Sequence, residues 1–361
     1  MRQASDGKRA KWDSWGAFTL VELLVVISII ALLVSILLPS LSAARDQAKA
    51  VVCLSNTKNV GMAVTHYSSA DRNGGYPASY LYPYDERGNW SPARQDTNHA
   101  YGYLHWSYAL FNKGAIDTKA FSCPKFENGG APRTNPGPAP EDWEPEQVDQ
   151  NGAMGPNLLQ DRQAPRMSLA ANAAIIPRNK FTRALSGGNR VNKFTNDSVI
   201  KRPQGTILAT EYINNWKALG IDEGGSGVLS KSHRPINPFY HLGSGFNEYE
   251  AIQDSPGFIY GLVSRPKTPE DYGLIPREAA ERQTNVLDHT SGVSQVNAVG
   301  RHHPGGGENR KKWGGTANFL FCDGHAERRT ILETLQKRMW GDHYYTLSGS
   351  NEVLNFVPPP Q

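Results

Sequence analysis

The chain has 361 residues, of which 39% are hydrophobic and 20% charged, and its 38 basic and 34 acidic residues leave a net charge of +4. This length allows one large domain or two modest ones, each able to bury a core. Because the small positive excess is spread along the chain, it excludes the concentrated basic surface that nucleic-acid binding requires, and we expect no nucleic-acid partner.

A single long apolar run stands near the N-terminus of an otherwise polar chain, whose mean hydropathy is -0.52. Residues 18–38 carry one charge, Glu22. At about 1.5 Å per residue, a helix of this length spans the roughly 30 Å hydrocarbon core of a bilayer. Residues 1–17 carry four basic and two acidic side chains, which favours a cytoplasmic N-terminus. We therefore predict a single-pass protein of the cytoplasmic (inner) membrane with an extracytoplasmic head.

Three other interpretations of the apolar run explain its features less well. A cleaved secretory signal would use a site such as Ser42-Ala43-Ala44, but its apolar region is normally only about 7–15 residues long. A plain signal anchor explains the length and the flanking charge but gives no reason for an acid in the run. A buried core helix is disfavoured by the basic flank and by the lack of a polar face.

The motif at the start of the run points to a family. Phe-Thr-Leu-Val-Glu-Leu-Leu-Val-Val-Ile begins at Phe18 and follows Gly16-Ala17 and a short basic leader. It resembles the N-terminal signal of type IV prepilins and type II secretion pseudopilins. The resemblance implies that a prepilin peptidase removes residues 1–17, cutting between Ala17 and Phe18, and methylates the new amine of Phe18.

The cleavage register depends on two landmarks. Counted from Phe18, Glu22 is fifth and Pro39 is twenty-second, where the family carries its acid and often a helix-bending proline. The chain departs from the family at Ala17, because the usual residue before the cut is Gly. A cut after Gly16 is the alternative, and it would place Glu22 sixth.

The resemblance also implies a role for Glu22 in assembly. When such subunits pack their N-terminal helices together, the amine of an incoming subunit enters an apolar bundle and needs a partner. A carboxylate one turn along a neighbouring helix supplies that partner and sets the stagger of the subunits. The expected partners are the membrane, the prepilin peptidase and other pilin-like subunits, which bind through the N-terminal helix.

The expected fold class is α+β, with the long membrane-spanning helix packed on a pilin-like head that has a small antiparallel sheet. Helical spacing of apolar residues predicts an amphipathic extension over 39–69, with Pro39 as a kink and Ser40 as a cap. Gly61 inside this helix is tolerable where another element approaches closely. The head is expected over 70–361. Its loop insertions are predicted at about 128–165, 220–277 and 300–316.

Within the head, residues 201–211 predict a turn leading into a buried strand, and 317–327 predict a hairpin around Asp323-Gly324. Residues 106–111 are compatible with a strand or a helical turn. Residues 330–340 predict a short helix.

The hairpin resembles the ending of one subgroup of prepilin-like proteins, whose signature is His, nine residues and Asp-Gly. Here His302 and His303 lie about twenty residues before Asp323 and Gly324, with an apparent insertion between them. The placement of Cys53 and of the Cys123-Pro124 pair also resembles this subgroup.

Three cysteines are too few for a disulfide scaffold and show no C-x-x-C zinc spacing. A disulfide between Cys53 and Cys123 would tie the long helix to the head in an oxidising location. Cys322 would then remain as a small buried thiol in the hairpin.

We expect no cofactor and no metal. Turn geometry explains Asp323, and adjacent histidines in a Gly-rich loop are commonly solvated. If a metal binds, its weak candidate ligands are His302, His303, Asp323 and His325.

The predicted function is therefore non-enzymatic: a prepilin-like subunit, processed by prepilin peptidase and assembled into a type IV pilus or a type II secretion pseudopilus. The sequence contains no G-x-S-x-G, H-E-x-x-H, phosphate-loop or dinucleotide motif. The alternative is a membrane-anchored extracytoplasmic module that binds a ligand or glycan and uses the prepilin-type signal for export. A third hypothesis, a metal-dependent hydrolase, needs a site that the sequence does not offer.

Overall fold

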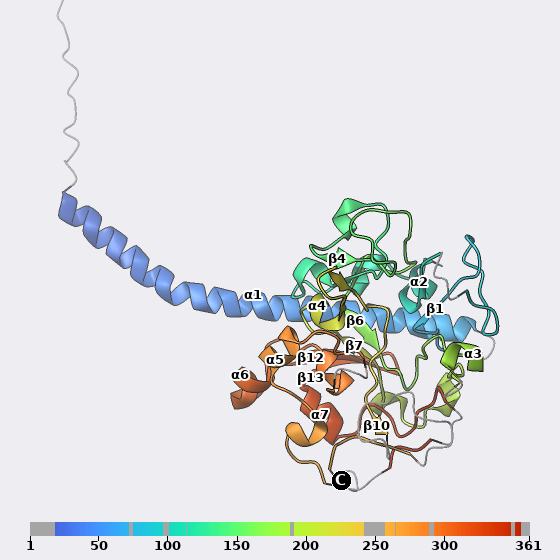
Figure 1. The fold of residues 1–361 in the computed structure, drawn as a ribbon. Helices are drawn as coiled ribbons and strands as arrows, with labels where there is room; N and C mark the ends of the chain where they lie inside the picture. The colour runs from blue at the N-terminus through green and yellow to red at the C-terminus, as the bar shows by residue number, and fades with distance from the viewer. Residues whose placement is uncertain are drawn as a thin grey trace, which may run out of the picture. The chain divides into compact units, whose positions relative to one another are not determined.

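The computed structural model describes residues 19–71, 75–96, 101–112, 114–187, 191–241, 257–263, 265–288, 292–347 and 351–354. The chain divides into two compact units, Met1–Arg45 and Asp46–Gln361. Helix α1 (Leu20–Ala70), the long blue ribbon in Figure 1, contains residues of both units.

In the first unit the described residues form the apolar half of helix α1. Its large hydrophobic side chains are exposed, from 79% at Leu20 to 43% at Val34. By length and composition this helix is able to cross a membrane, which agrees with the predicted membrane-spanning segment. Pro39 lies inside the helix, which does not stop there. Ser40 does not cap a second helix as predicted, because its hydroxyl donates to the Leu37 carbonyl at 2.8 Å within the continuous helix.

The second unit is built around a four-stranded antiparallel sheet with the order β13-β12-β7-β6. Its members are β6 (Leu169–Ala171), β7 (Ile207–Glu211), β12 (Ala317–Phe321) and β13 (Ala326–Arg329). Every residue of β7 and β12 is buried, which is the pattern of strands covered on both faces. The predicted buried strand and the predicted Asp-Gly hairpin are thus both confirmed.

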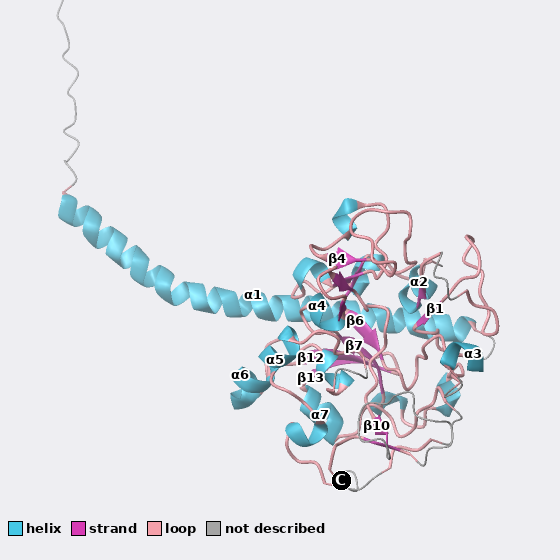
Figure 2. Ribbon diagram, in the orientation of Figure 1, coloured by secondary structure: helices cyan, strands magenta, loops and turns pink. Residues whose placement is uncertain are grey.

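Short elements surround this sheet (Figure 2). The other helices are α2 (Trp106–Phe111), α3 (Arg183–Ser186), α4 (Trp216–Leu219), α5 (Arg277–Arg282), α6 (Arg310–Trp313) and α7 (Ile331–Gln336). The other strands are β1 (Tyr80–Leu81), β2 (Leu104–His105), β3 (Ala131–Pro132), β4 (Gln147–Val148), β5 (Arg166–Met167), β8 (Ile221–Asp222), β9 (Val228–Leu229), β10 (Tyr240–His241) and β11 (Phe258–Ile259). Sheet β4-β9-β8 is mixed, because β4 and β9 run parallel. The described residues therefore form an α+β fold.

Within the second unit, the distal half of helix α1 packs on the sheet. Cys53, Val60 and Val64 are buried in the core. A Cβ atom at Gly61 would lie 2.5 Å from Leu320 Cδ1 and 2.9 Å from the Gly324 carbonyl oxygen. The helix therefore approaches β12 and the hairpin turn so closely that only glycine fits, as the sequence suggested.

The C-terminal helix is shorter than predicted. Helix α7 covers Ile331–Gln336, with Thr330 as its N-cap accepting from the Glu333 N–H at 3.3 Å. The next residues leave helical geometry, since Arg338 has a φ of 53°. The ambiguous stretch at residues 106–111 forms helix α2.

The segment expected as a loop excursion over 128–165 differs from the expectation in its burial. Thr134, Asn135 and Val148 are 0% exposed. The Thr134 hydroxyl donates to the Ser230 carbonyl at 2.8 Å, and Asn135 donates to Asp161 through its backbone N–H at 2.9 Å. Polar composition did not keep this segment at the surface, because hydrogen bonds satisfy its buried groups.

Candidate functional site

Four side chains with metal-ligand or redox chemistry meet in the interior of the head. The donor atoms of Cys53, Cys123, Glu211 and His303 all lie within 4.8 Å of one another, and all four residues are buried. Cys53 belongs to helix α1 and Glu211 ends strand β7. Cys123 follows a 3-10 turn, and His303 forms a bridge with Thr316 just before strand β12.

Cys53 and Cys123 are joined by a disulfide, with their Cα atoms 5.0 Å apart. This is the pairing that the sequence suggested, and it ties helix α1 to the loop before strand β3. Two further contacts lie along the same seam: Asn56 donates to the Ser122 carbonyl at 2.9 Å, and Lys125 pairs with Asp46 at 2.6 Å. The helix is thus held to the head covalently as well as by packing.

Cys322 is a free thiol and is half-buried, not fully buried as predicted. Burial raises the pKa of its thiol, since the thiolate is the disfavoured form in an apolar environment. An unreactive thiol is the consequence.

Glu211 is a carboxylate inside the core, with 1% of its surface exposed. It accepts hydrogen bonds from the Asn318 backbone N–H at 2.8 Å and from the Asn318 amide at 3.1 Å. His303 Nε2 lies 2.9 Å from Glu211 Oε2 and 3.0 Å from Glu211 Oε1. Burial alone would raise the pKa of Glu211, but its hydrogen bonds to His303 and to the Asn318 backbone N–H lower it below its usual value. The acid therefore stays ionised.

His302 and His303 are buried, 5% and 0% exposed, and not solvated as expected, and they differ in their surroundings. His303 directs Nε2 at Glu211 and also lies 3.8 Å from Cys123 Sγ, whereas His302 Nε2 lies 3.9 Å from the same sulfur. Burial lowers the pKa of His302 to about 4, so this ring is neutral at pH 7. The Nδ1 atoms of both rings are buried without a hydrogen-bond partner among the described residues.

This arrangement suits binding or structural chemistry better than nucleophilic catalysis. A nucleophile-activating histidine uses one ring nitrogen toward the nucleophile and the other toward an acid. Here one nitrogen of His303, Nε2, faces both Glu211 and Cys123. Sulfur, imidazole and carboxylate together are a donor set for a transition metal such as zinc.

The remaining weak metal candidates lie elsewhere. Asp323 and His325 form a pair at the hairpin turn, where Asp323 Oδ1 and His325 Nδ1 are 2.5 Å apart and both side chains are about a third or more exposed. Gly324 has a φ of 86°, which the turn requires. The structure thus separates His303, inside the cluster, from Asp323 and His325. Turn geometry accounts for Asp323 as expected.

Sequence reasoning did not single out Glu211 as a site residue. The signal that could have identified it is its position at the end of the apolar stretch Ile-Leu-Ala-Thr-Glu. A charged side chain in a strand that is covered on both faces needs a specific partner, and this indicates a polar site.

The N-terminal signal is described only in part. Ala17 and Phe18, the predicted cleavage pair, lie outside the described residues. Glu22 is described, and its carboxylate accepts from the Thr19 backbone N–H at 2.9 Å and from the Thr19 hydroxyl at 2.8 Å. The Glu22 N–H donates to the Thr19 hydroxyl at 3.2 Å. These reciprocal bonds form a capping box at the start of helix α1, a local role that the sequence analysis missed although Thr-x-x-Glu is its signature.

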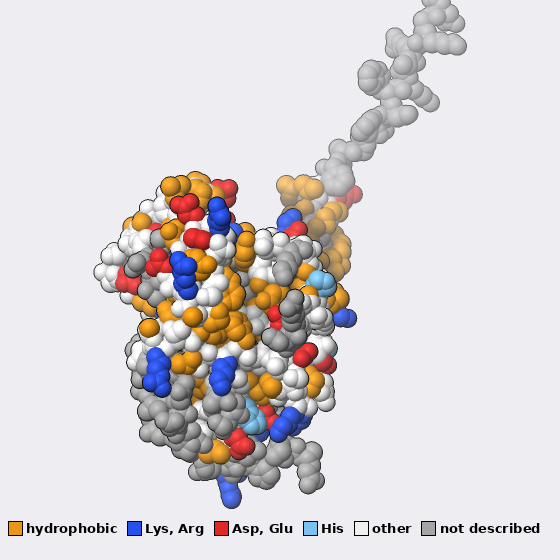
Figure 3. Space-filling model, turned by 90° about the vertical axis from the view of Figure 1, so that its right-hand side faces the viewer, with side chains coloured by type: hydrophobic (Ala, Val, Ile, Leu, Met, Phe, Trp, Pro, Cys, Tyr) orange, Lys and Arg blue, Asp and Glu red, His pale blue; other side chains and the backbone are white. Residues whose placement is uncertain are grey.

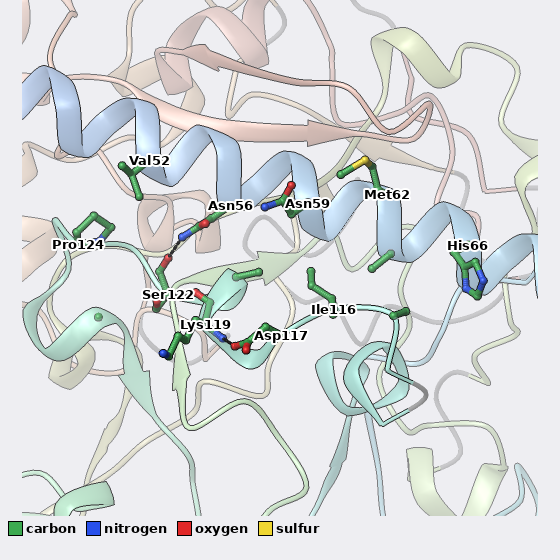
Figure 4. A pocket seen from close by; sticks show the side chains of 14 residues that line it. Val52, Asn56, Asn59, Met62, His66, Ile116, Asp117, Lys119, Ser122 and Pro124 are labelled. Carbon is green, nitrogen blue, oxygen red and sulfur yellow. Dashed lines mark hydrogen bonds between the residues drawn. The ribbon is translucent and has the colours of Figure 1, made fainter.

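A groove of about 810 Å³ runs beside the distal half of helix α1 (Figure 4). Val52, Asn56, Asn59 and His66 face it from the helix, and Ile116 is one of the residues on the opposite wall. The fourteen residues that line it include no tryptophan, tyrosine or phenylalanine. The groove therefore lacks the aromatic rings that commonly stack on sugars.

On the face drawn in Figure 3, Lys and Arg side chains are scattered among Asp and Glu, in line with the even charge distribution of the sequence. No family model, no curated protein and no solved structure matches this chain. Fold and site define it as an α+β protein in which a long apolar N-terminal helix continues into a disulfide-tied head.

Proposed function

We propose that this chain is a prepilin-like, non-enzymatic subunit that is cut by a prepilin peptidase and assembled into a type IV pilus or a type II secretion pseudopilus. One observation carries the proposal: the exposed apolar half of helix α1 holds a single acid, Glu22, in the register that a cut before Phe18 requires. In this proposal the leader lies in the cytoplasm and the head outside the cytoplasmic membrane.

The disulfide supports the extracytoplasmic placement of the head. Disulfides form and persist mainly in oxidising compartments and are rare in the cytosol. Cys53 and Cys123 are joined in the head, 70 residues apart in sequence.

The capping box adds a step to the proposed role of Glu22. In the isolated chain the carboxylate is bonded to Thr19 of its own helix. On assembly it would exchange this partner for the amine of a neighbouring subunit. Glu22→Gln separates the two roles, because glutamine also serves in a capping box but carries no charge.

The test is expression of the full chain with and without a prepilin peptidase, followed by mass spectrometry of the N-terminus. Processing at Phe18 with added methyl mass is expected only with the peptidase. An unchanged mass, or a new N-terminus at another residue, would contradict the proposal. In the same cells Glu22→Gln and Glu22→Ala should both insert but fail to cross-link into assemblies. Normal assembly of Glu22→Gln would refute the charge role.

The alternative, an anchored ligand-binding module, stays a prediction. The groove beside helix α1 gives it a place to bind, but the residues that line it include no Trp, Tyr or Phe to stack on a sugar ring, which favours a ligand other than a glycan.

A further inference from the structure

We propose that, before the disulfide closes, the head binds one zinc ion through the thiolates of Cys53 and Cys123, the imidazole Nε2 of His303 and the carboxylate of Glu211. The proposal concerns the reduced chain and is independent of the proposed prepilin-like function.

The donor atoms already have nearly the spacing of a zinc site. Zinc bonds of about 2.0–2.3 Å in a tetrahedron place neighbouring donor atoms about 3.3–3.8 Å apart. The four donor atoms here lie within 4.8 Å of one another, and His303 Nε2 is 3.8 Å from Cys123 Sγ. On reduction the two sulfurs have to separate, and His303 Nε2 and Glu211 Oε2, which are 2.9 Å apart, have to move apart by a few tenths of an ångström.

The site is preorganised around Glu211. Its carboxylate is held by the backbone and side-chain N–H groups of Asn318, which would fix its orientation toward an ion. His303 is held by its backbone bridge to Thr316, with the two N–O distances both 3.1 Å. Strand β7 and the bridge to Thr316 before strand β12 therefore place two ligands rigidly, and helix α1 brings the third.

The donor set gives a reason for a cation at this position. The Glu211 carboxylate lies inside the core with 1% of its surface exposed, and the donor atoms of Cys53, Cys123 and His303 all lie within 4.8 Å of it. Reduction would add two thiols beside this carboxylate. Binding of Zn²⁺ to both releases two protons and places a divalent charge against three anionic donors, so no oxidant or reductant takes part in the binding step.

The disulfide and the metal exclude each other, since the same two sulfurs serve both. In the oxidised chain only His303 and Glu211 remain as donors of this set, which is too few for a closed zinc site. A bound zinc would hold helix α1 against the sheet at the place where the disulfide later joins them, and would keep the two thiols paired in the correct register.

The test uses the full chain in detergent, either oxidised or treated with a phosphine reductant without oxygen, then dialysed against zinc and measured by elemental analysis. We expect one zinc per reduced chain and none per oxidised chain. Cobalt in place of zinc should give a thiolate-to-cobalt charge-transfer band only in the reduced chain. Failure of the reduced chain to bind either metal would overturn the proposal.

Variants assign the ligands. His303→Ala and Glu211→Gln should weaken zinc binding by more than about 100-fold, since loss of an outer-shell partner alone costs about 10–100-fold. His325→Ala removes an imidazole from the exposed hairpin turn and is the matched control, with unchanged binding expected. Equal loss in His325→Ala would indicate adventitious binding and refute the site.

His302→Ala tests the fourth ligand. Unchanged zinc binding supports Glu211, whereas loss of binding here together with retention in Glu211→Gln would overturn the assignment. Far-ultraviolet circular dichroism of each oxidised variant verifies that it folds. If His303→Ala does not fold, the Cys53→Ser variant, in which no disulfide between Cys53 and Cys123 can form, decides the matter: cobalt bound with an undiminished charge-transfer band there would contradict the two-thiolate site.

Discussion

Lys231 is a cation in the interior of the head, with 8% of its surface exposed. Burial, together with the charges of Arg234 and Arg178, lowers the pKa of its ammonium group to about 7. In the unfolded chain the pKa returns to about 10.4, so the unfolded state binds more protons between pH 7 and pH 10.4. The stability of the protein should therefore rise with pH across this window, and the full penalty is present below pH 7.

Replacing Lys231 with methionine removes this penalty while keeping the aliphatic bulk. We expect the free energy of unfolding to increase by roughly 4.5 kcal/mol at pH 6 and by roughly 2 kcal/mol at pH 9. Urea denaturation of both proteins at the two pH values measures the difference. Lys311→Met, at an exposed lysine, should change neither value, and a Lys231→Met gain that is equal at both pH values would disprove the titration argument.

At the scale of elements, the critical contact is the crossing of helix α1 over strand β12 and the hairpin turn. A Cβ at Gly61 would lie 2.9 Å from the Gly324 carbonyl, which is backbone and cannot move aside easily. Gly324 allows both the tight turn, through its φ of 86°, and the approach of the helix, since a Cβ there would lie 3.2 Å from Thr65 Oγ1.

Gly61→Ala should consequently destabilise the head, although alanine favours a helix by about 1 kcal/mol. Overpacking at such a contact costs about 1–3 kcal/mol, so we expect a net loss of about 1 kcal/mol and a lower melting temperature by differential scanning calorimetry. Gly205→Ala is the control, since nothing lies within 4 Å of its added Cβ. A melting temperature for Gly61→Ala at or above that of the wild type would show that the helix can shift.

For the whole molecule, the division into Met1–Arg45 and Asp46–Gln361 separates the apolar segment from the folded head. All large hydrophobic side chains between Leu20 and Leu38 are exposed. Such a large apolar surface is unfavourable in water and favourable in the hydrocarbon core of a bilayer. The head has its own core and its own disulfide.

In detergent phase partitioning, the full chain should enter the detergent-rich phase and residues 46–361 the aqueous phase. A full-length Val25→Lys, Leu33→Lys variant has the same length but a charged segment, and should move to the aqueous phase. Retention of residues 46–361 with the detergent would place the membrane affinity in the head instead.

The parts of the fold that were predicted from sequence share a local physical cause. Hydropathy and helical periodicity predict helix α1. Turn chemistry predicts the Asp323-Gly324 hairpin, and the short apolar run predicts the strand that ends at Glu211. The local Thr19–Glu22 capping box was equally available but was overlooked. The prediction that Ser40 caps a second helix was wrong, because helix α1 continues past Pro39 and the Ser40 hydroxyl donates to the Leu37 carbonyl within it.

The amino-acid sequence by itself determined the apolar segment, its single acid and the positions of the cysteines, because these depend on residues adjacent in the chain. Only the tertiary structure decided that Glu211 and His303 meet at the Cys53–Cys123 disulfide, and that Asp323 and His325 do not join them. The four residues of the cluster come from four separate parts of the chain, and the pairing of strands β7 and β12 against helix α1 sets the distances between them. Sequence spacing does not encode such long-range packing.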